Sequence, residues 1–312
     1  FGESYMAGDW ESADLAGVLT EFGRSLAELI PPALQRFRRI AVVRAPRSQR
    51  NHPTQARENV SAHYDLSNEL FAEFLDKTMT YSSALFDHLP ATWAELPAAQ
   101  HNKIDRLLDA SGVHVGSEVL EIGTGWGELC IRAARRGAHV RSVTLSVEQQ
   151  RLAQQRVAAA GFSDRVSIEL LDSRSVQGQD DAVVSVEMIE AVGYQFWPTY
   201  FQTLERLVRP HGRVTIQAIT MPHDRMLASR DTYTWIQKYI FPGGLLPSED
   251  AIADITARHT GLRTVDVSWM GSHYAETLRL WRERFLHPRG GGVALGVCGR
   301  LRGRWGVVPG EP

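Results

Sequence analysis

The stretch "SEVLEIGTGWGEL" (residues 117–129) contains the clearest indication of the fold. An apolar run is followed by glycines at alternate positions, Gly123, Gly125 and Gly127, and a helical pattern then begins. Glycines in such a turn allow a tight change of direction and a close approach of the backbone to a ligand. The stretch therefore predicts a strand, a glycine turn and a helix, with a ligand at the carboxyl end of the strand.

The spacing of the glycines indicates which ligand to expect. A dinucleotide fingerprint would place its third glycine at position 128, where this chain has Glu128. The observed order is an acid, Glu121, followed by glycine at every second position, which is typical of S-adenosylmethionine (SAM) methyltransferases. We expect the glycines to make room for the methionine part of SAM and Glu121 to hold its ammonium. A glycine-rich turn without a cofactor is the alternative.

Strand and helix patterns alternate on both sides of this stretch. The predicted strands are 117–123, 139–146, 166–172, 182–189 and 213–220, and the predicted helices include 127–137 and 147–161. Such alternation predicts an α/β fold with a doubly wound parallel sheet, here a class I SAM-dependent methyltransferase (Rossmann-like) sheet. Helical spacing of apolar residues in 1–35 adds a helical N-terminal segment.

Polar side chains follow the second and third predicted strands, where a nucleoside would lie. They are Thr144, Ser146, Gln149, Asp172 and Ser173. We expect the first three near the ribose and the last two near adenine. Ser146 is also a candidate helix cap, with Glu148 or Gln149 completing a capping box.

Composition narrows the class of protein. The chain has 312 residues, a net charge of -2 and two cysteines, Cys130 and Cys298. The charge argues against a dedicated nucleic-acid binder, and the cysteines have no metal-binding spacing. Widely separated cysteines make the reducing cytoplasm the expected location. The segment 36–52 carries six arginines and no acid, so it is either a solvated linker or a patch that attracts an anionic membrane surface.

Several longer motifs resemble the cyclopropane-fatty-acid synthase family, which includes the mycolic acid cyclopropane synthases. The most specific are "HYDLSNELFAEFLDKTMTYSSALF" (63–86), "VEMIEAVG" (186–193), "WIQKYIFPGGLLPS" (235–248) and "HYAETLRLWRERF" (273–285). The resemblance covers roughly residues 1–286. It divides the chain into a remnant of a helical N-terminal domain with a basic linker (1–55), a methyltransferase domain (56–286) and an atypical tail rich in Gly, Pro and Arg (287–312).

The resemblance implies transfer of the SAM methyl group to a double bond of an unsaturated acyl chain in a phospholipid. A carbocation forms on the chain, and a bound bicarbonate removes a proton from it. Carried over by motif, Glu190, Tyr274 and the Ile219 backbone hold the bicarbonate, with Ser83 and Gln217 beside them. Tyr81 and Ser82 match residues that cover the cofactor. The family acts at the inner face of the membrane, and the sequence leaves a homodimer open.

Three residues depart from the usual family pattern. Ser83 replaces a cysteine, Ala191 a histidine and Gln217 a second histidine. These replacements resemble a branch linked to 10-methyl-branched (tuberculostearic) acids, in which proton loss after a hydride shift gives an exomethylene group instead of a ring. The product is therefore either a cyclopropane or a 10-methylene fatty acid. A methyltransferase for a soluble small molecule and a catalytically impaired SAM- or lipid-binding homologue are the alternative functions.

The stretch "VSVEMIEAVGYQFWPTYF" (184–201) places two acids, Glu187 and Glu190, at the end of a predicted strand. Five aromatic residues follow within it. We expect most of these rings to pack in the core and one or two to line an acyl tunnel.

Overall fold

The computed structural model describes residues 2–29 and 68–286. Predictions about the basic segment 36–52, the 55/56 domain boundary and the tail 287–312 lie outside the described residues.

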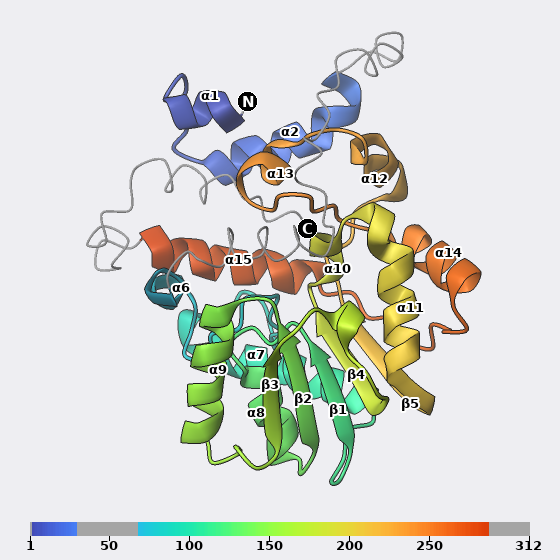
Figure 1. Cartoon of the computed structure of the whole chain (residues 1–312). Helices are drawn as coiled ribbons and strands as arrows, with labels where there is room; N and C mark the ends of the chain where they lie inside the picture. The colour runs from blue at the N-terminus through green and yellow to red at the C-terminus, as the bar shows by residue number, and fades with distance from the viewer. Residues whose placement is uncertain (1, 30–67, 287–312) are drawn as a thin grey trace.

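A five-stranded parallel sheet forms the centre of the described chain (Figure 1). Its strands are β1 (Glu118–Ile122), β2 (His139–Thr144), β3 (Val166–Leu170), β4 (Asp180–Val186) and β5 (Val208–Gln217). The order is β3-β2-β1-β4-β5, and Val119 of β1 pairs with Val140 on one side and Ala182 on the other. The chain winds outward in both directions from β1, so the gap between the β1 and β4 ends is the expected place for a ligand. The doubly wound prediction is confirmed.

Helices cover both faces of the sheet, separated by short connections. The α-helices are α1 (Gly2–Ala7), α2 (Leu15–Leu29), α6 (Asn68–Phe74), α7 (Leu96–Ala110), α8 (Glu128–Arg135), α9 (Val147–Ala159), α10 (Ile189–Val192), α11 (Trp197–Leu207), α12 (His223–Ser229), α13 (Trp235–Tyr239), α14 (Glu249–His259) and α15 (Gly271–Leu286). Short 3-10 turns are η2 (Trp93–Glu95), η3 (Ser173–Ser175) and η4 (Tyr194–Phe196). The helical N-terminal segment is confirmed by α1 and α2.

Alternation along the strands divides the core into two layers. Val119 packs with residues of α7, α8 and α9, whereas its neighbour Leu120 packs with residues of α11 and α14. Successive strand side chains point to opposite faces, so one strand supplies both layers. The continuous apolar runs noted in the sequence are explained by this two-sided burial.

A third apolar cluster lies beyond the carboxyl ends of the strands. Phe71 and Phe74 of α6 contact Tyr81, Trp126 and Trp281, and the last of these belongs to α15. Figure 1 shows α15 running across this end of the sheet. The edge that carries the glycine turn is thereby covered by helix rather than left open.

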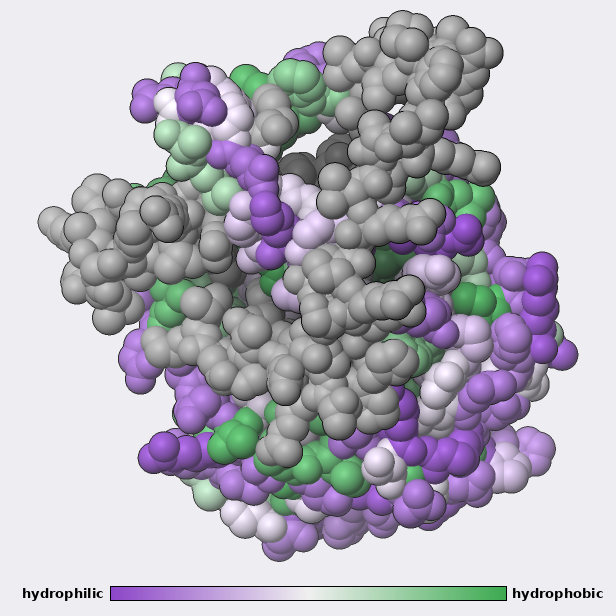
Figure 2. Space-filling view, turned by 45° about the horizontal axis from the view of Figure 1, so that its top comes forward, coloured by the Kyte–Doolittle hydropathy of each residue, from purple (hydrophilic) through white to green (hydrophobic). Residues whose placement is uncertain are grey.

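The N-terminal helices contact the α12–α13 region. The Tyr239 hydroxyl donates to Glu3 at 2.9 Å, and Arg225 donates to the Gly23 carbonyl at 3.1 Å. On the face shown in Figure 2, the described residues form hydrophilic areas interspersed with smaller hydrophobic patches, as is usual for folded proteins. Among the described helices, none is both long and apolar enough to cross a membrane.

The strand that precedes the two glutamates is shorter than predicted. It ends at Val186, and Glu187 adopts a left-handed backbone angle (φ 49°) before α10 begins. Glu190 therefore lies in a short helix and not in a strand. The left-handed conformation of Glu187 ends the extended strand and turns the chain over the edge of the sheet. This conformation is strained for a residue other than glycine.

Candidate functional site: a glycine turn beside two glutamates

The three glycines of the turn have different structural roles. All have positive φ, at 95° for Gly123, 52° for Gly125 and 87° for Gly127. A methyl group on Gly123 would meet the Met188 sulfur at 2.7 Å, and one on Gly127 would meet the Ala153 side chain at 3.1 Å. A methyl group on Gly125 would meet nothing within 4 Å. Gly123 and Gly127 are thus required by packing, whereas Gly125 faces open space that a ligand can fill.

Glu121 is buried directly before this turn. The Cys130 thiol and the Ser142 hydroxyl both donate to its Oε2, each at 2.7 Å. Burial raises the pKa of Glu121 to about 7, against the lowering effect of those two donors. Its Oε1 receives no hydrogen bond from the described residues, so this oxygen is left for a cationic group such as the predicted ammonium.

The polar residues after β2 bind one another. The Thr144 hydroxyl donates to Gln149 Oε1 at 3.0 Å, and Ser146 Oγ caps α9 by accepting the Gln149 N–H at 3.2 Å. The capping role of Ser146 is confirmed. The capping box is wrong, because the Gln149 side chain reaches Thr144 and the Ser146 N–H also donates to Thr144. Contact with a ribose stays a prediction.

The residues after β3 form a turn of their own. Asp172 accepts the Arg174 N–H and its side-chain Nε, each at 2.9 Å, and caps η3, which begins at Ser173. The position beyond the strand end is as predicted. The adenine contact of Asp172 and Ser173 stays a prediction.

Glu128, the residue that departs from the dinucleotide fingerprint, fastens the turn to its surroundings. It accepts from Arg156 at 2.7 Å and from His101 Nε2 at 2.9 Å. Arg156 also donates to the carbonyls of Thr78 and Trp126, at 2.9 and 2.7 Å. One arginine thereby links the glycine turn, α9 and the segment that leads to Tyr81.

The segment that contains Tyr81 and Ser82 is bound by side chains of α7. Ser82 is buried; its carbonyl accepts from Gln100 Nε2 at 2.9 Å and its Oγ from Lys103 Nζ at 2.6 Å. Tyr81 contacts the rings of Phe71 and Trp281 with centroid distances of 5.3 Å each. The structure therefore anchors the two residues predicted to cover the cofactor, although nothing in the sequence had pointed to Gln100 or Lys103.

The residues predicted to bind bicarbonate gather around two carboxylates. Glu187 Oε1 accepts the Ser83 N–H at 2.9 Å and the Gln217 side-chain amide at 2.8 Å. Glu190 Oε1 accepts the Ile219 N–H, while Glu190 Oε2 is buried and finds no hydrogen-bond partner among the described residues. The structure brings four of the five predicted residues together, and it adds Glu187, to which the sequence had given no role.

The two glutamates differ in how strongly each holds its proton. Burial, and then the neighbouring Glu187 charge, raises the pKa of Glu190 to about 8. Burial also raises the pKa of Glu187, but the Ser83 N–H, the Lys103 charge and Gln217 oppose this. Of the two, Glu187 is therefore the carboxyl that ionises more readily, and Glu190 is the one that keeps its proton longer as pH rises, as expected of close carboxyl pairs.

Tyr274 lies in the first turn of α15. Other residues of that helix bind the chain after Ser83: Thr277 Oγ1 accepts the Ala84 N–H at 3.1 Å and His273 Nδ1 the Phe86 N–H at 3.2 Å. The helix that carries Tyr274 thus borders the site. A bond from its hydroxyl to an anion stays a prediction.

The aromatic residues after Glu190 are mostly core. Trp197, Tyr200 and Phe201 are buried in the layer that contains α11, and the Tyr200 hydroxyl donates to Ser185 at 2.9 Å. Tyr194 is exposed, with Arg230 over its ring at 5.3 Å. The packing prediction is confirmed for the three buried rings.

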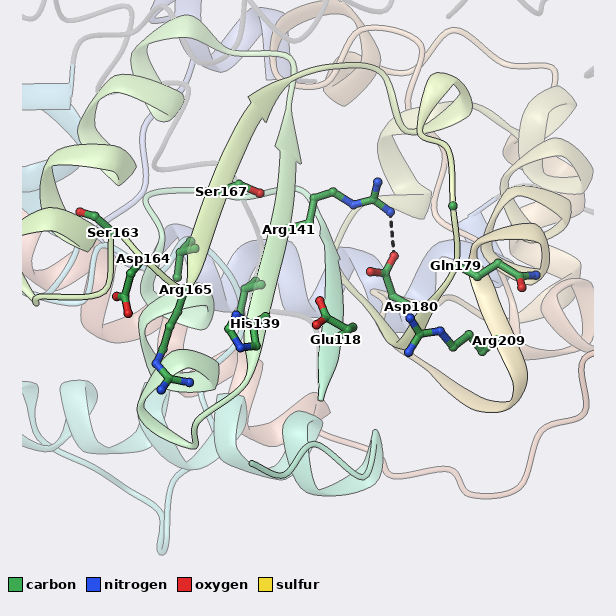
Figure 3. A pocket seen from close by; sticks show the side chains of 13 residues that line it. Glu118, His139, Arg141, Ser163, Asp164, Arg165, Ser167, Gln179, Asp180 and Arg209 are labelled. Atoms are coloured by element: carbon green, nitrogen blue, oxygen red, sulfur yellow. Dashed lines mark hydrogen bonds and ion pairs between the residues drawn. The ribbon is translucent and has the colours of Figure 1, made fainter. Parts of the chain in front are cut away.

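A separate cleft of about 550 Å³ lies at the opposite end of the sheet (Figure 3). It is lined by Glu118, His139 and Asp180, which begin their strands, and Arg141 pairs with Asp180 there at 2.8 Å. Ligands of open parallel sheets bind at the carboxyl ends. We therefore place the functional site at the glycine turn.

The sheet order, the open glycine turn and the acid before it define a class I SAM-dependent methyltransferase. Comparison with known proteins narrows the class. The profile described as mycolic acid cyclopropane synthetase matches residues 51–305, and the chain belongs to this family.

Individual relatives agree with this assignment. The chain is 66% identical over 300 residues to tuberculostearic acid methyltransferase UfaA1 of Mycobacterium tuberculosis, covering 95% of this chain and 70% of that one. It is 35% identical over 287 residues to a cyclopropane-fatty-acyl-phospholipid synthase of Escherichia coli, covering 91% and 71%. The crystal structure of the mycolic acid cyclopropane synthase CmaA1, complexed with SAH and CTAB, superposes with a TM-score of 0.73 at 30% identity, covering 81% of this chain and 91% of that one.

Proposed function

We propose that this chain transfers the methyl group of SAM to the double bond of unsaturated fatty acyl chains in phospholipids. The observation that supports this most is the pair formed by half-buried Glu187 and buried Glu190, on the same sheet edge as the open Gly125 turn. After the methyl group has been transferred to an alkene, a base must remove a proton from the resulting carbocation. A carboxyl pair that holds one proton can act as this base through its ionised member. Relatives whose names specify fatty acyl or tuberculostearic substrates support the choice of an acyl chain.

The cofactor site fits SAM by the space at Gly125 and by Glu121 Oε1, which accepts no hydrogen bond within the described part of the chain. The residues that we propose to hold SAM are Tyr81, Ser82, Glu121, Gly123, Gly125, Gly127, Thr144, Ser146, Gln149, Asp172 and Ser173. The sulfonium supplies an activated methyl group. The chain contributes alignment, since a weakly nucleophilic alkene reacts only when it is held close and in line.

The family resemblance and the structure point to different groups as the base. The family resemblance implies a bicarbonate held by Glu190, Tyr274 and Ile219. In the structure, the Ser83 and Gln217 donors already bind the Glu187 carboxylate. We propose that Glu187 accepts the proton directly, and that bicarbonate, if it binds, does so beside the protonated Glu190.

The product depends on whether a hydride shift precedes the loss of a proton from the added methyl group. After a hydride shift, the electrons of a C–H bond on the added methyl group form an exomethylene double bond, and the proton passes to the base. Loss of the same proton without the shift closes a cyclopropane ring. The relative named for tuberculostearic acid, together with Ser83 and Gln217, favours a 10-methylene product.

The remaining parts of the proposal concern the setting. We propose a peripheral contact with the anionic inner face of the cytoplasmic membrane, supported by the arginines of 36–52. A homodimer remains a prediction.

Mass spectrometry of lipids from cells that express the chain tests the function. We expect a gain of one methylene unit in mass on unsaturated acyl chains, and proton NMR should separate exomethylene from cyclopropane signals. Glu187→Gln should lower turnover by about 10²- to 10⁴-fold, the usual contribution of a general base. If bicarbonate is the base instead, its removal from purified enzyme will abolish turnover and Glu187→Gln will not. Unmodified lipids alongside methylated small molecules would refute the acyl substrate.

A further inference from the structure

Lys103 is a buried cation that the proposed reaction does not yet use. It lies on the inner face of α7 with Gln100 and Ile104, one helical turn apart, and is 2% exposed. Its ammonium donates to Ser82 Oγ at 2.6 Å. Within residues 2–29 and 68–286, no carboxylate oxygen lies within the 4.0 Å of an ion pair. An ammonium has three N–H donors, so most of its hydrogen-bonding capacity is available.

This arrangement is costly for the protein alone. Burial lowers the pKa of Lys103 to about 8, and the charges of Glu187, Glu121 and Asp76 act in the opposite direction. The lysine therefore remains mostly protonated at neutral pH, inside the protein and without a direct counterion. Buried charges are normally paired, so an unpaired one beside a cofactor site indicates an anionic ligand group.

Ser82 is held in one orientation by the same helix. Its carbonyl accepts from Gln100 and its Oγ accepts from Lys103. A serine hydroxyl has a single hydrogen to donate. Because the lysine occupies an acceptor position, that hydrogen must be directed away from Lys103, and no acceptor for it is found in the described part of the chain.

We propose that Lys103 is a positioning residue that fixes Ser82 as a hydrogen-bond donor to the carboxylate of the cofactor's methionine portion. The amino-acid end of SAM is a zwitterion. Glu121 offers a buried negative partner for its ammonium, and Lys103 with Ser82 offers the matching positive side for its carboxylate. The inference rests on the proposed cofactor site, and it adds a residue from a helix that carries none of the site motifs.

A pair of ligands tests this without measuring activity. SAM carries the carboxylate, whereas decarboxylated SAM lacks it and keeps the ammonium. In calorimetry, Lys103→Met should weaken SAM binding by about 10- to 100-fold, the usual range for a charge-assisted hydrogen bond. Binding of decarboxylated SAM should change by less than about twofold. If Lys103 merely supports the loop, Lys103→Met should weaken the binding of both ligands equally.

Two further variants serve as controls. Glu121→Gln should weaken both ligands, because both contain the ammonium. Ser82→Ala should repeat the selective loss of Lys103→Met, and the double variant should lose little more than the single ones. If Lys103→Met does not fold, as judged by circular dichroism, Ser82→Ala decides the question with the same two ligands.

The outcomes separate the two proposals. Wild-type protein that binds neither ligand would overturn the cofactor site itself. Wild-type protein that binds SAM, combined with equal losses for both ligands in the variants, would overturn only the role of Lys103.

Discussion

Replacing Glu190 by glutamine should change how the stability of this protein depends on pH. Glu190 is 9% exposed, and the pKa of its carboxyl group rises from 4.5 to about 8 through burial and the neighbouring Glu187 charge. Since the folded pKa is the higher one, the folded state retains a proton that the unfolded state releases. The stabilisation is therefore complete below about pH 4.5 and is lost progressively as pH rises towards 8.

The magnitude follows from the pKa difference. One pKa unit corresponds to about 1.4 kcal/mol, so Glu190 alone can change the free energy of unfolding by about 5 kcal/mol between these limits. Coupling with Glu187 divides this effect between the two carboxyl groups. We therefore expect a slope of about 0.5–1 kcal/mol per pH unit that depends on Glu190. Glutamine is neutral at every pH and should remove that slope.

Urea denaturation at several pH values between 5.5 and 7.5 measures the effect at constant ionic strength. This window stays below the pKa of Lys103, about 8, whose lowering from 10.5 acts in the opposite direction at higher pH. Glu121, with its pKa raised to about 7, contributes equally to wild type and variant. Glu169→Gln, an exposed carboxylate in β3, is the matched control and should leave the slope unchanged. Equal slopes for wild type and Glu190→Gln would refute the raised pKa assigned to Glu190.

The glycine turn gives two contrasting predictions. Gly125→Asn should fold, because its φ of 52° suits asparagine and open space surrounds it, but its side chain should abolish SAM binding in calorimetry; a folded variant that still binds would contradict the cofactor position. Gly123→Ala should lower the free energy of unfolding by about 1–3 kcal/mol, since its methyl group meets the Met188 sulfur at 2.7 Å; an unchanged urea midpoint would show that this contact relaxes freely.

Much of the site could be predicted because it is recorded in short stretches of sequence. The glycine turn, the acid before it and the Ser146 cap depend on neighbours within a few residues, and the structure has them where the pattern indicated. The capping box failed for a tertiary reason. Gln149 found a better partner in Thr144, which lies on the preceding strand and is buried beside it.

The groups that define the chemistry came together only in three dimensions. Glu187 binds donors 104 and 30 residues away, Ser83 and Gln217, and Lys103 reaches Ser82 from a separate helix. Local periodicity says which face of a helix or strand is buried, but not what a buried polar group will meet there. The sequence by itself thus determined the sheet, the turn and the expectation of SAM. The tertiary structure decided which carboxylate holds the charge, because burial and the nearest donors set a pKa, and both depend on how distant segments pack.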